Sequence, residues 1–146
     1  MKAVQALWTE DWPIPKENGW PWVEILTSHA GARSETVTHW LSSKVKGLVL
    51  AGSGMGGFHD AWRDSLAAAV KHEIALVRTT RTGAGETLPD LPEKDINGCL
   101  ASGSLTAPRA RIALQLALNA EKQAQAAGKS LTWQDFARMA VLPVIR

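Results

Sequence analysis

Three glycines in one short stretch have the spacing of a phosphate-binding turn. Gly52, Gly54 and Gly57 satisfy the pattern G-x-G-x-x-G, directly after an apolar segment and before a segment with helical periodicity. In such a turn the backbone approaches a pyrophosphate, and the N-terminus of a helix beginning near His59 would hold the anion. A dinucleotide-binding domain that uses these three glycines is therefore one hypothesis for the chain.

Two features of the surrounding sequence weaken the dinucleotide hypothesis. The glycines follow the second apolar segment rather than the first, and the next segment ends in Arg78, Thr79 and Arg81 instead of an acid for a ribose hydroxyl. An arginine suits a 2′-phosphate, so NADP stays open as a ligand. A glycine turn that swings a strand closely into a helix needs no ligand at all. We favour this second explanation and expect no cofactor.

Other residue types that carry chemistry show no reactive pattern. The histidines have no i, i+4 pairing with a third ligand nearby, and a single cysteine, Cys99, adds nothing that resembles a zinc site. Thr79 and Thr80 have no lysine and aspartate placed around them to activate a hydroxyl nucleophile. We therefore expect neither a catalytic residue nor a metal ligand. The histidines concerned are His29, His39, His59 and His72.

Composition indicates one globular domain without a nucleic-acid or membrane partner. The chain has 146 residues, of which 45% are hydrophobic and 21% charged, and a formal net charge of +2. Its Lys and Arg residues form no basic run, and no stretch approaches the roughly 20 apolar residues that span a bilayer. Lys2 is followed by Glu10, Asp11 and several prolines before any apolar region, which does not fit a secretory signal. We expect a cytoplasmic protein.

The elements that must position these residues alternate between strand and helix. Continuous apolar runs predict strands at residues 23–28, 46–51, 74–79 and 99–101. Helical periodicity and caps predict helices at residues 34–43, 59–72 and 110–127, and from Ser130 or Thr132 to about residue 139. Strands that are apolar on both faces are typical of a parallel sheet between helices. The sequence predicts a small three-layer α/β domain, Rossmann-like or flavodoxin-like, with a mainly parallel sheet of about four strands.

Two segments fall outside this alternation. Residues 1–21 contain several prolines and most of a cluster of four tryptophans, which predicts a linker or an irregular strap. These rings would cover the chain's own domain, residues 22–146, or a surface that belongs to a missing neighbour. Residues 80–97 form a long loop rich in glycine, proline and acids, and loops of this length are usually functional or disordered. The four tryptophans are Trp8, Trp12, Trp20 and Trp22.

Four segments together are more specific than any single motif. They are VEILTSHAGA, KGLVLAGSGMGG, IALVRTTRTGAG and NGCLASGSLTAPRARIALQLAL, in this order and at these spacings. The combination resembles the C-terminal domain of the bacterial L-asparaginase and glutaminase family, over residues 23–118. In that family a larger N-terminal domain supplies a nucleophilic threonine in a T-G-G-T motif and a second Thr-Asp-Lys group that activates the attack.

The resemblance implies amidohydrolase chemistry, in which asparagine or glutamine is hydrolysed through an acyl-enzyme with release of ammonia. Neither a T-G-G-T nor a G-T-D-T string occurs in this sequence. We therefore expect the chain alone to be inactive and to contribute assembly and closure of a substrate site. It would form a dimer or tetramer. It would bind a small amino-acid substrate only when paired with a catalytic domain. The alternative is a stand-alone, non-catalytic dimerisation module.

The resemblance also implies which residues close the site. The family places a polar residue in the glycine turn, where this sequence has Gly57, and often a second asparagine, where it has Met55. The corresponding contact is therefore missing or made by backbone. An acid in the loop before the small-residue strand would pair with the substrate's ammonium group, and Asp90 and Glu86 are the candidates. For each of these acids, a solvated position without a ligand is the alternative.

Overall fold

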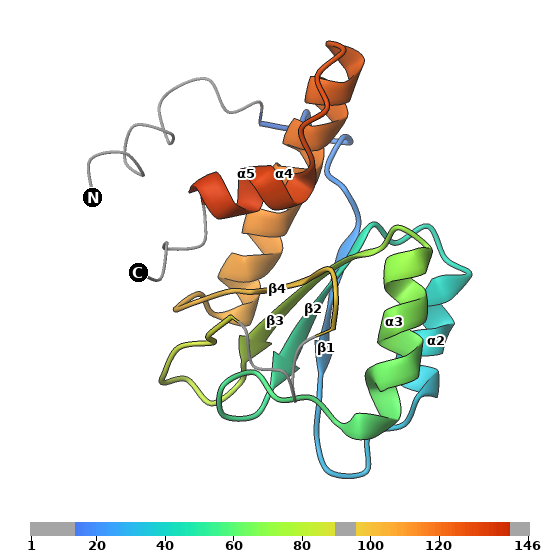
Figure 1. The fold of residues 1–146 in the computed structure, drawn as a ribbon, viewed down its shortest axis with the longest axis vertical. Coiled ribbons are helices and arrows are strands. Elements are labelled where there is room, and N and C mark those ends of the chain that lie inside the picture. The colour runs from blue at the N-terminus through green and yellow to red at the C-terminus, as the bar shows by residue number, and fades with distance from the viewer. Residues whose placement is uncertain (1–13, 90–95, 141–146) are drawn as a thin grey trace.

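A parallel sheet of four strands forms the centre of the computed structural model, which describes residues 14–89 and 96–140 (Figure 1). Neighbouring strands pair in the order β1-β2-β3-β4, and every pairing is parallel. The strands are β1 (Val23–Thr27), β2 (Gly47–Gly52), β3 (Ala75–Thr80) and β4 (Cys99–Ala101). With helices on both faces, this arrangement confirms the predicted small three-layer α/β domain.

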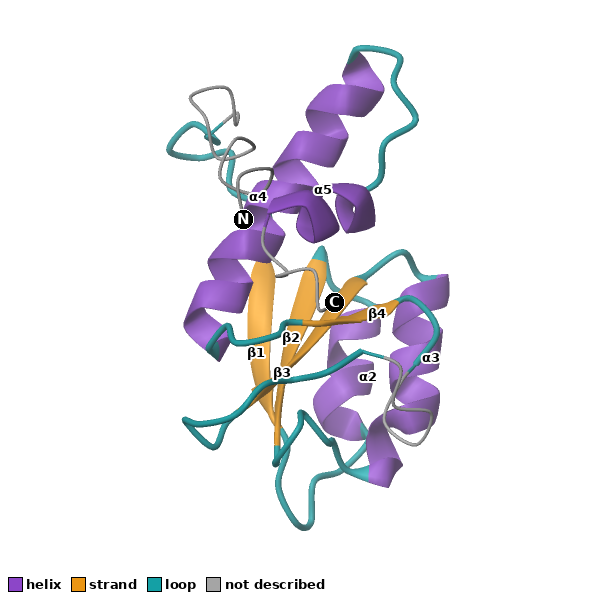
Figure 2. Ribbon diagram, turned by 60° about the vertical axis from the view of Figure 1, so that its left-hand side comes forward, coloured by secondary structure: helices purple, strands orange, loops and turns teal. Residues whose placement is uncertain are grey.

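Helices cover the two faces of the sheet in pairs (Figures 1 and 2). On one face lie α2 (Glu35–Leu41) and α3 (Arg63–Lys71), and a short 3-10 turn, η1 (Asp60–Trp62), leads into α3. On the other face lies α4 (Ala107–Ala126), and α5 (Trp133–Ala140) packs against α4. Every residue of β2 is buried because both of its faces are covered, as its continuous apolar run predicts.

Two apolar cores result, one on each face of the sheet. The core under α2 and α3 is built around Leu48, Leu50, Leu66, Leu76 and Trp62. The core under α4 is built around Val23, Val49, Val77, Leu114 and Ala117. Successive residues of a strand point to opposite faces, so each central strand contributes to both cores.

The ends of the helices differ from the sequence-based bounds where caps decide them. α4 begins at Ala107 rather than at residue 110, because Pro108 is accommodated in the first turn, whose N–H groups need no intrahelical acceptor. At the start of α5, Thr132 Oγ1 and Asp135 Oδ2 lie 2.9 Å apart, and Asp135 Oδ2 also accepts the backbone N–H of Thr132 at 2.9 Å. Both bonds lower the pKa of the Asp135 carboxyl, and the bond from the backbone N–H has the larger effect.

The described part of the N-terminal segment is attached to α4 through side chains. Gln115 Nε2 donates to the carbonyl oxygen of Pro21 at 2.8 Å, and Arg111 Nε donates to that of Val23 at 2.8 Å. Trp20 and Trp22 remain 39% and 44% exposed. Trp8 and Trp12 lie outside the described residues, and the division into a strap and a domain at residue 22 stays a prediction. No described helix is long and apolar enough to cross a bilayer.

Candidate functional site

Three loops that follow β2, β3 and β4 lie at the carboxyl edge of the sheet (Figure 1). They comprise residues 53–58, 81–89 and 102–106. Ligand sites of open α/β sheets lie at this edge, outside the carboxyl ends of the strands. The glycine turn and the described part of the long acidic loop therefore belong to one place in the structure, although 23 or more residues separate them in the sequence.

The glycine turn after β2 closes on itself. The N–H of Ser53 donates to the carbonyl oxygen of Gly57 at 2.8 Å, and the N–H of Gly57 donates back to that of Ser53 at 2.8 Å. Gly54 and Gly56 have φ values of +52° and +84°, a region that favours glycine. A Cβ on Gly52 would lie 2.3 Å from the carbonyl oxygen of Gly57. The geometry of the turn therefore accounts for Gly52, Gly54 and Gly56 without a ligand.

The helix start beyond the turn offers little room for a pyrophosphate. His59 Nδ1 accepts the N–H of Ala61 at 3.1 Å, and the N–H of His59 donates to Ser28 Oγ at 2.8 Å. Asp60 adds an acid in the first turn, which disfavours an anion there. Among the four described strands the order also runs sequentially, without the reversal that creates the ligand crevice of doubly wound dinucleotide-binding sheets. These observations argue against the dinucleotide hypothesis.

Arg78, in β3, links the glycine turn to the loop that follows β3. Its side chain is fully buried. Nη1 donates to the carbonyl oxygen of Met55 at 2.8 Å, and Nη2 donates to that of Leu88. The suggestion that an arginine here binds a 2′-phosphate is therefore wrong for Arg78, because its guanidinium points into the protein and binds backbone carbonyls.

Two buried threonines attach the third loop to this arrangement. Thr79 Oγ1 donates to the carbonyl oxygen of Leu105 at 2.7 Å. Thr87 pairs with Gly103 through two backbone bonds, of 2.8 Å from the Thr87 N–H and 3.2 Å from the Gly103 N–H. The three loops are therefore joined into one platform, which we call the carboxyl-edge platform: residues 53–58, 81–89 and 102–106.

The predicted substrate-binding residues occupy different positions on this platform. Gly57 is half-buried, and both its N–H and its carbonyl are used within the turn. Met55 is 39% exposed, and Glu86 is exposed on the loop after β3. Asp90 lies outside the described residues. Substrate binding by these residues stays a prediction, although the structure brings the segments of Met55, Gly57 and Glu86 together.

Sequence reasoning missed the two buried residues that organise the platform. Arg78 interrupts an otherwise apolar strand, and this was the signal that could have identified it as a buried polar residue with backbone partners. Thr87 gave no such signal, because its backbone pairing with Gly103 joins segments that are distant in the sequence.

Replacing Thr87 with valine is expected to raise the free energy of unfolding by about 1 kcal/mol. Thr87 is fully buried, and its Oγ1 has no hydrogen-bond partner in the part of the chain that the structure describes. Valine keeps the shape and removes the unsatisfied hydroxyl. Thr79→Val is the matched control, because this equally buried hydroxyl does donate a bond, and its loss should cost about 1 kcal/mol. Urea unfolding of both variants is the measurement, and equal destabilisation by both would contradict the prediction.

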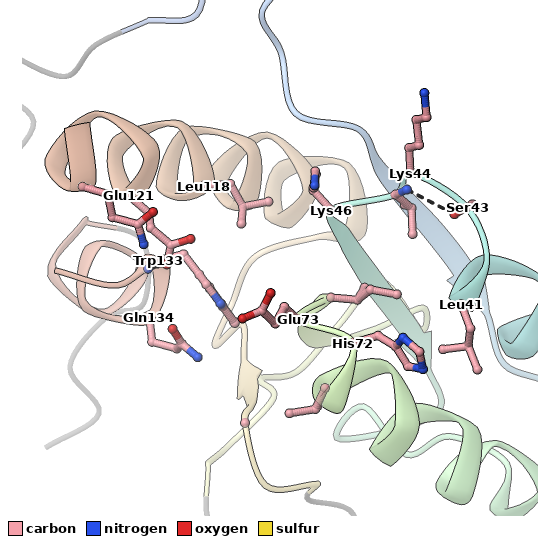
Figure 3. Close-up of a pocket in the computed structure, with 15 residues that line it drawn as sticks. Leu41, Ser43, Lys44, Lys46, His72, Glu73, Leu118, Glu121, Trp133 and Gln134 are labelled. Carbon is pink, nitrogen blue, oxygen red and sulfur yellow. Dashed lines mark hydrogen bonds between the residues drawn. The ribbon is translucent and has the colours of Figure 1, made fainter. Parts of the chain in front are cut away.

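A concavity of about 560 Å³ lies at the opposite, amino edge of the sheet (Figure 3). Lys46, Glu73, Glu121 and Trp133 are among its lining residues. Glu121 Oε2 accepts the backbone N–H of Trp133 at 2.7 Å, so this carboxylate already binds the start of α5. Of the predicted site residues that the structure describes, none lines this concavity. Within the same described ranges, no group of three His, Cys, Asp or Glu side chains is placed to hold a metal ion.

Comparison with known proteins finds a family match over most of the chain. Residues 22–130 match the family described as the Glutaminase/Asparaginase C-terminal domain. The chain is 37% identical to an L-asparaginase 2 from Bacillus subtilis over 110 residues, and 36% identical to an L-asparaginase 2 from Escherichia coli over 120 residues. These alignments cover 74% and 80% of this chain but 28% and 34% of the relatives. The chain therefore spans about a third of the length of these curated relatives.

A third relative corrects the expected cellular location. The chain is 34% identical over 110 residues to a protein of Haemophilus influenzae that is named a probable periplasmic L-asparaginase. The alignment covers 75% of this chain and 32% of that relative. This finding contradicts our expectation of a cytoplasmic protein, which rested on the absence of a secretory signal pattern in the first residues.

Proposed function

Because this chain belongs to the Glutaminase/Asparaginase C-terminal domain family, we propose that it closes the substrate site of an L-asparaginase-type amidohydrolase. The catalytic nucleophile would come from a separate, N-terminal domain. The observation that carries the proposal is the carboxyl-edge platform, in which the glycine turn and the loop after β3 are joined through Arg78. These are the two segments from which the family closes its site.

In the proposed reaction the nucleophile attacks the side-chain amide carbon of asparagine. The amide nitrogen leaves as ammonia, and water hydrolyses the resulting acyl-enzyme to aspartate. In this reaction, the role of this chain is to bind and orient the substrate. Glu86 is exposed on the platform and would face the substrate's ammonium group with a carboxylate.

The glycine turn would bind substrate less tightly than in family members that carry a polar side chain there. Gly57 has no side chain, and its N–H and carbonyl both bond to Ser53. A contact from the Gly57 backbone would therefore require the turn to open. We propose that this contact is missing, which leaves more space beside the substrate and lowers affinity.

The chain alone is expected to release no ammonia from asparagine or glutamine above the rate in buffer. The sequence contains neither a T-G-G-T nor a G-T-D-T string. In addition, Thr79 Oγ1 donates to a backbone carbonyl in the buried interior, so its hydroxyl is not available to attack a substrate. A coupled assay for ammonia on the purified protein is the measurement. Release well above buffer and proportional to protein concentration would contradict the proposal, and its loss in a Thr80→Val variant would place the nucleophile in this chain.

We also propose that the chain self-associates as a dimer or tetramer. Its support is the family, in which the C-terminal domain contributes to assembly. Trp22 and Ile112, which are 44% and 45% exposed, are large apolar side chains that such an interface would cover. Sedimentation velocity over a range of concentrations tests it. A species that stays strictly monomeric at the highest concentration would contradict self-association.

A periplasmic location is part of the proposal. Its support is the name of the relative from Haemophilus influenzae, which is a probable periplasmic L-asparaginase. Fractionation of cells of the source organism, with detection of this chain by antibody, tests it. Recovery only in the cytoplasmic fraction would contradict this part of the proposal.

A further inference from the structure

We infer that Arg78 is the positioning residue of the carboxyl-edge platform, because its guanidinium fixes the glycine turn and the Glu86 loop relative to each other. Two of its acceptors, the carbonyl oxygens of Met55 and Leu88, lie on these two segments. Met55 is two residues from Gly57, and Leu88 is two residues from Glu86. The inference rests on the proposed function in so far as these segments bind substrate.

The backbone of Arg78 is held from both sides. In the sheet it pairs with Leu50 of β2 and with Ala101 of β4. Its carbonyl oxygen also accepts the N–H of Ser102 at 3.0 Å, where the third loop of the platform begins. Because the backbone of Arg78 is fixed in the sheet, its side chain holds the loops that it binds in a defined position relative to the sheet.

Burying a guanidinium in a protein interior is energetically unfavourable unless it serves a specific role. Removing a cation from water is strongly unfavourable unless its donors find acceptors, whereas an apolar side chain would fill the same volume without that cost. Arginine presents planar, diverging N–H groups, so that Nη1 and Nη2 reach carbonyls on two different segments at once. This geometry is what a residue that joins two loops needs, and a lysine ammonium lacks it.

The glycine turn packs closely against Arg78 and Thr87 at Gly56. A Cβ on Gly56 would lie 2.8 Å from Thr87 Cγ2 and 3.4 Å from Arg78 Nη1. The glycine turn is therefore packed directly against both Arg78 and the loop after β3. Loss of the guanidinium would release the turn and this loop from each other, and would weaken the pairing of Thr87 with Gly103.

Amide hydrogen exchange of the chain alone tests the inference. The probes are the N–H groups of Ser53, Gly57 and Thr87, which are bonded within the platform, and the reference is Val49 in the centre of β2. In Arg78→Met we expect exchange at the probes to accelerate roughly tenfold more than at the reference, because two charged hydrogen bonds are lost. The matched control is Leu76→Ala, a fully buried position in the same strand that contacts the core rather than the platform.

Leu76→Ala should accelerate exchange at the probes and at the reference by similar factors, as a general loss of stability does. If the Arg78 variants show the same uniform pattern, Arg78 is only a stabilising residue and the inference is wrong. If Arg78→Met fails to fold, Arg78→Lys is used in its place. The lysine keeps the positive charge but cannot reach both carbonyl oxygens, so we expect at least one of the two segments to lose protection selectively. The experiment uses no substrate, so its outcome is independent of whether the proposed amidohydrolase function holds.

Discussion

Replacing Gly52 with alanine is expected to lower the free energy of unfolding by about 3 kcal/mol. The added Cβ would lie 2.3 Å from the carbonyl oxygen of Gly57 and 2.7 Å from the carbonyl carbon of Gly56. Both contacts are with backbone, so no side chain can rotate away and the turn must shift. Because Arg78 holds the same turn through Met55, the shift also disturbs the platform.

Gly54→Ala is the matched control for this prediction. Gly54 has a φ of +52°, but a Cβ there would meet no atom within 4 Å. Its replacement should therefore cost only about 1–2 kcal/mol, from backbone strain alone. Urea unfolding of the two variants separates the effects. If Gly52→Ala is no less stable than Gly54→Ala, the turn does not close as described, and the glycine pattern again needs a ligand to explain it.

Replacing Trp62 with alanine is expected to cost about 4 kcal/mol. Trp62 is a fully buried side chain in the core under α2 and α3. Its Nε1 donates to the carbonyl oxygen of Arg33 at 2.9 Å, which attaches the loop between β1 and α2 to the start of α3. Alanine would leave a large cavity and an unpaired carbonyl. Chemical denaturation at equilibrium is the measurement.

Two further variants serve as references for the loss of stability in Trp62→Ala. Trp62→Phe keeps most of the apolar volume and removes the indole donor, so it should cost clearly less than alanine. Trp22→Ala removes a ring that is 44% exposed and should change stability by less than about 1 kcal/mol. A cost at Trp62 no larger than that at Trp22 would show that the core under α2 and α3 is not packed around this indole.

The sheet and its helices could be predicted from the sequence because they rest on local patterns. The run from Gly47 to Gly52 is apolar throughout, which a strand buried on both faces requires. The cap of α5 could be predicted as well, since Thr132 was one of the two expected cap residues and its hydroxyl bonds Asp135. The boundaries of the helices differ from the predicted ones, and the first turn of the predicted helix at residues 59–72 is the 3-10 turn η1.

The platform could not be predicted because its contacts are not local. Arg78 occupies the expected strand, but the sequence does not reveal that its side chain turns inward to two backbone carbonyls on segments 23 and 10 residues away. The sequence favours the ligand-free explanation of the glycine pattern, but the reason becomes visible only in the 2.3 Å between a Cβ on Gly52 and the Gly57 carbonyl oxygen. Pattern matching identifies such a turn, whereas only geometry distinguishes a turn that holds a ligand from one that closes on itself.

The central claim is that this chain closes a substrate site and that another domain supplies the nucleophile. Reconstitution in trans tests this claim most directly. The N-terminal domain of the L-asparaginase 2 from Bacillus subtilis, a relative 37% identical to this chain over 110 residues, would be produced separately and mixed with it. The Gly52→Ala variant provides a control chain whose glycine turn is displaced.

The measurement is ammonia release from asparagine as the concentration of this chain is raised against a fixed amount of the N-terminal domain. The account predicts that the rate rises above the sum of the two separate rates and reaches a plateau, and that the Gly52→Ala chain gives a weaker rise. A rate that equals the sum of the separate rates at every concentration, with folded protein on both sides, would contradict it.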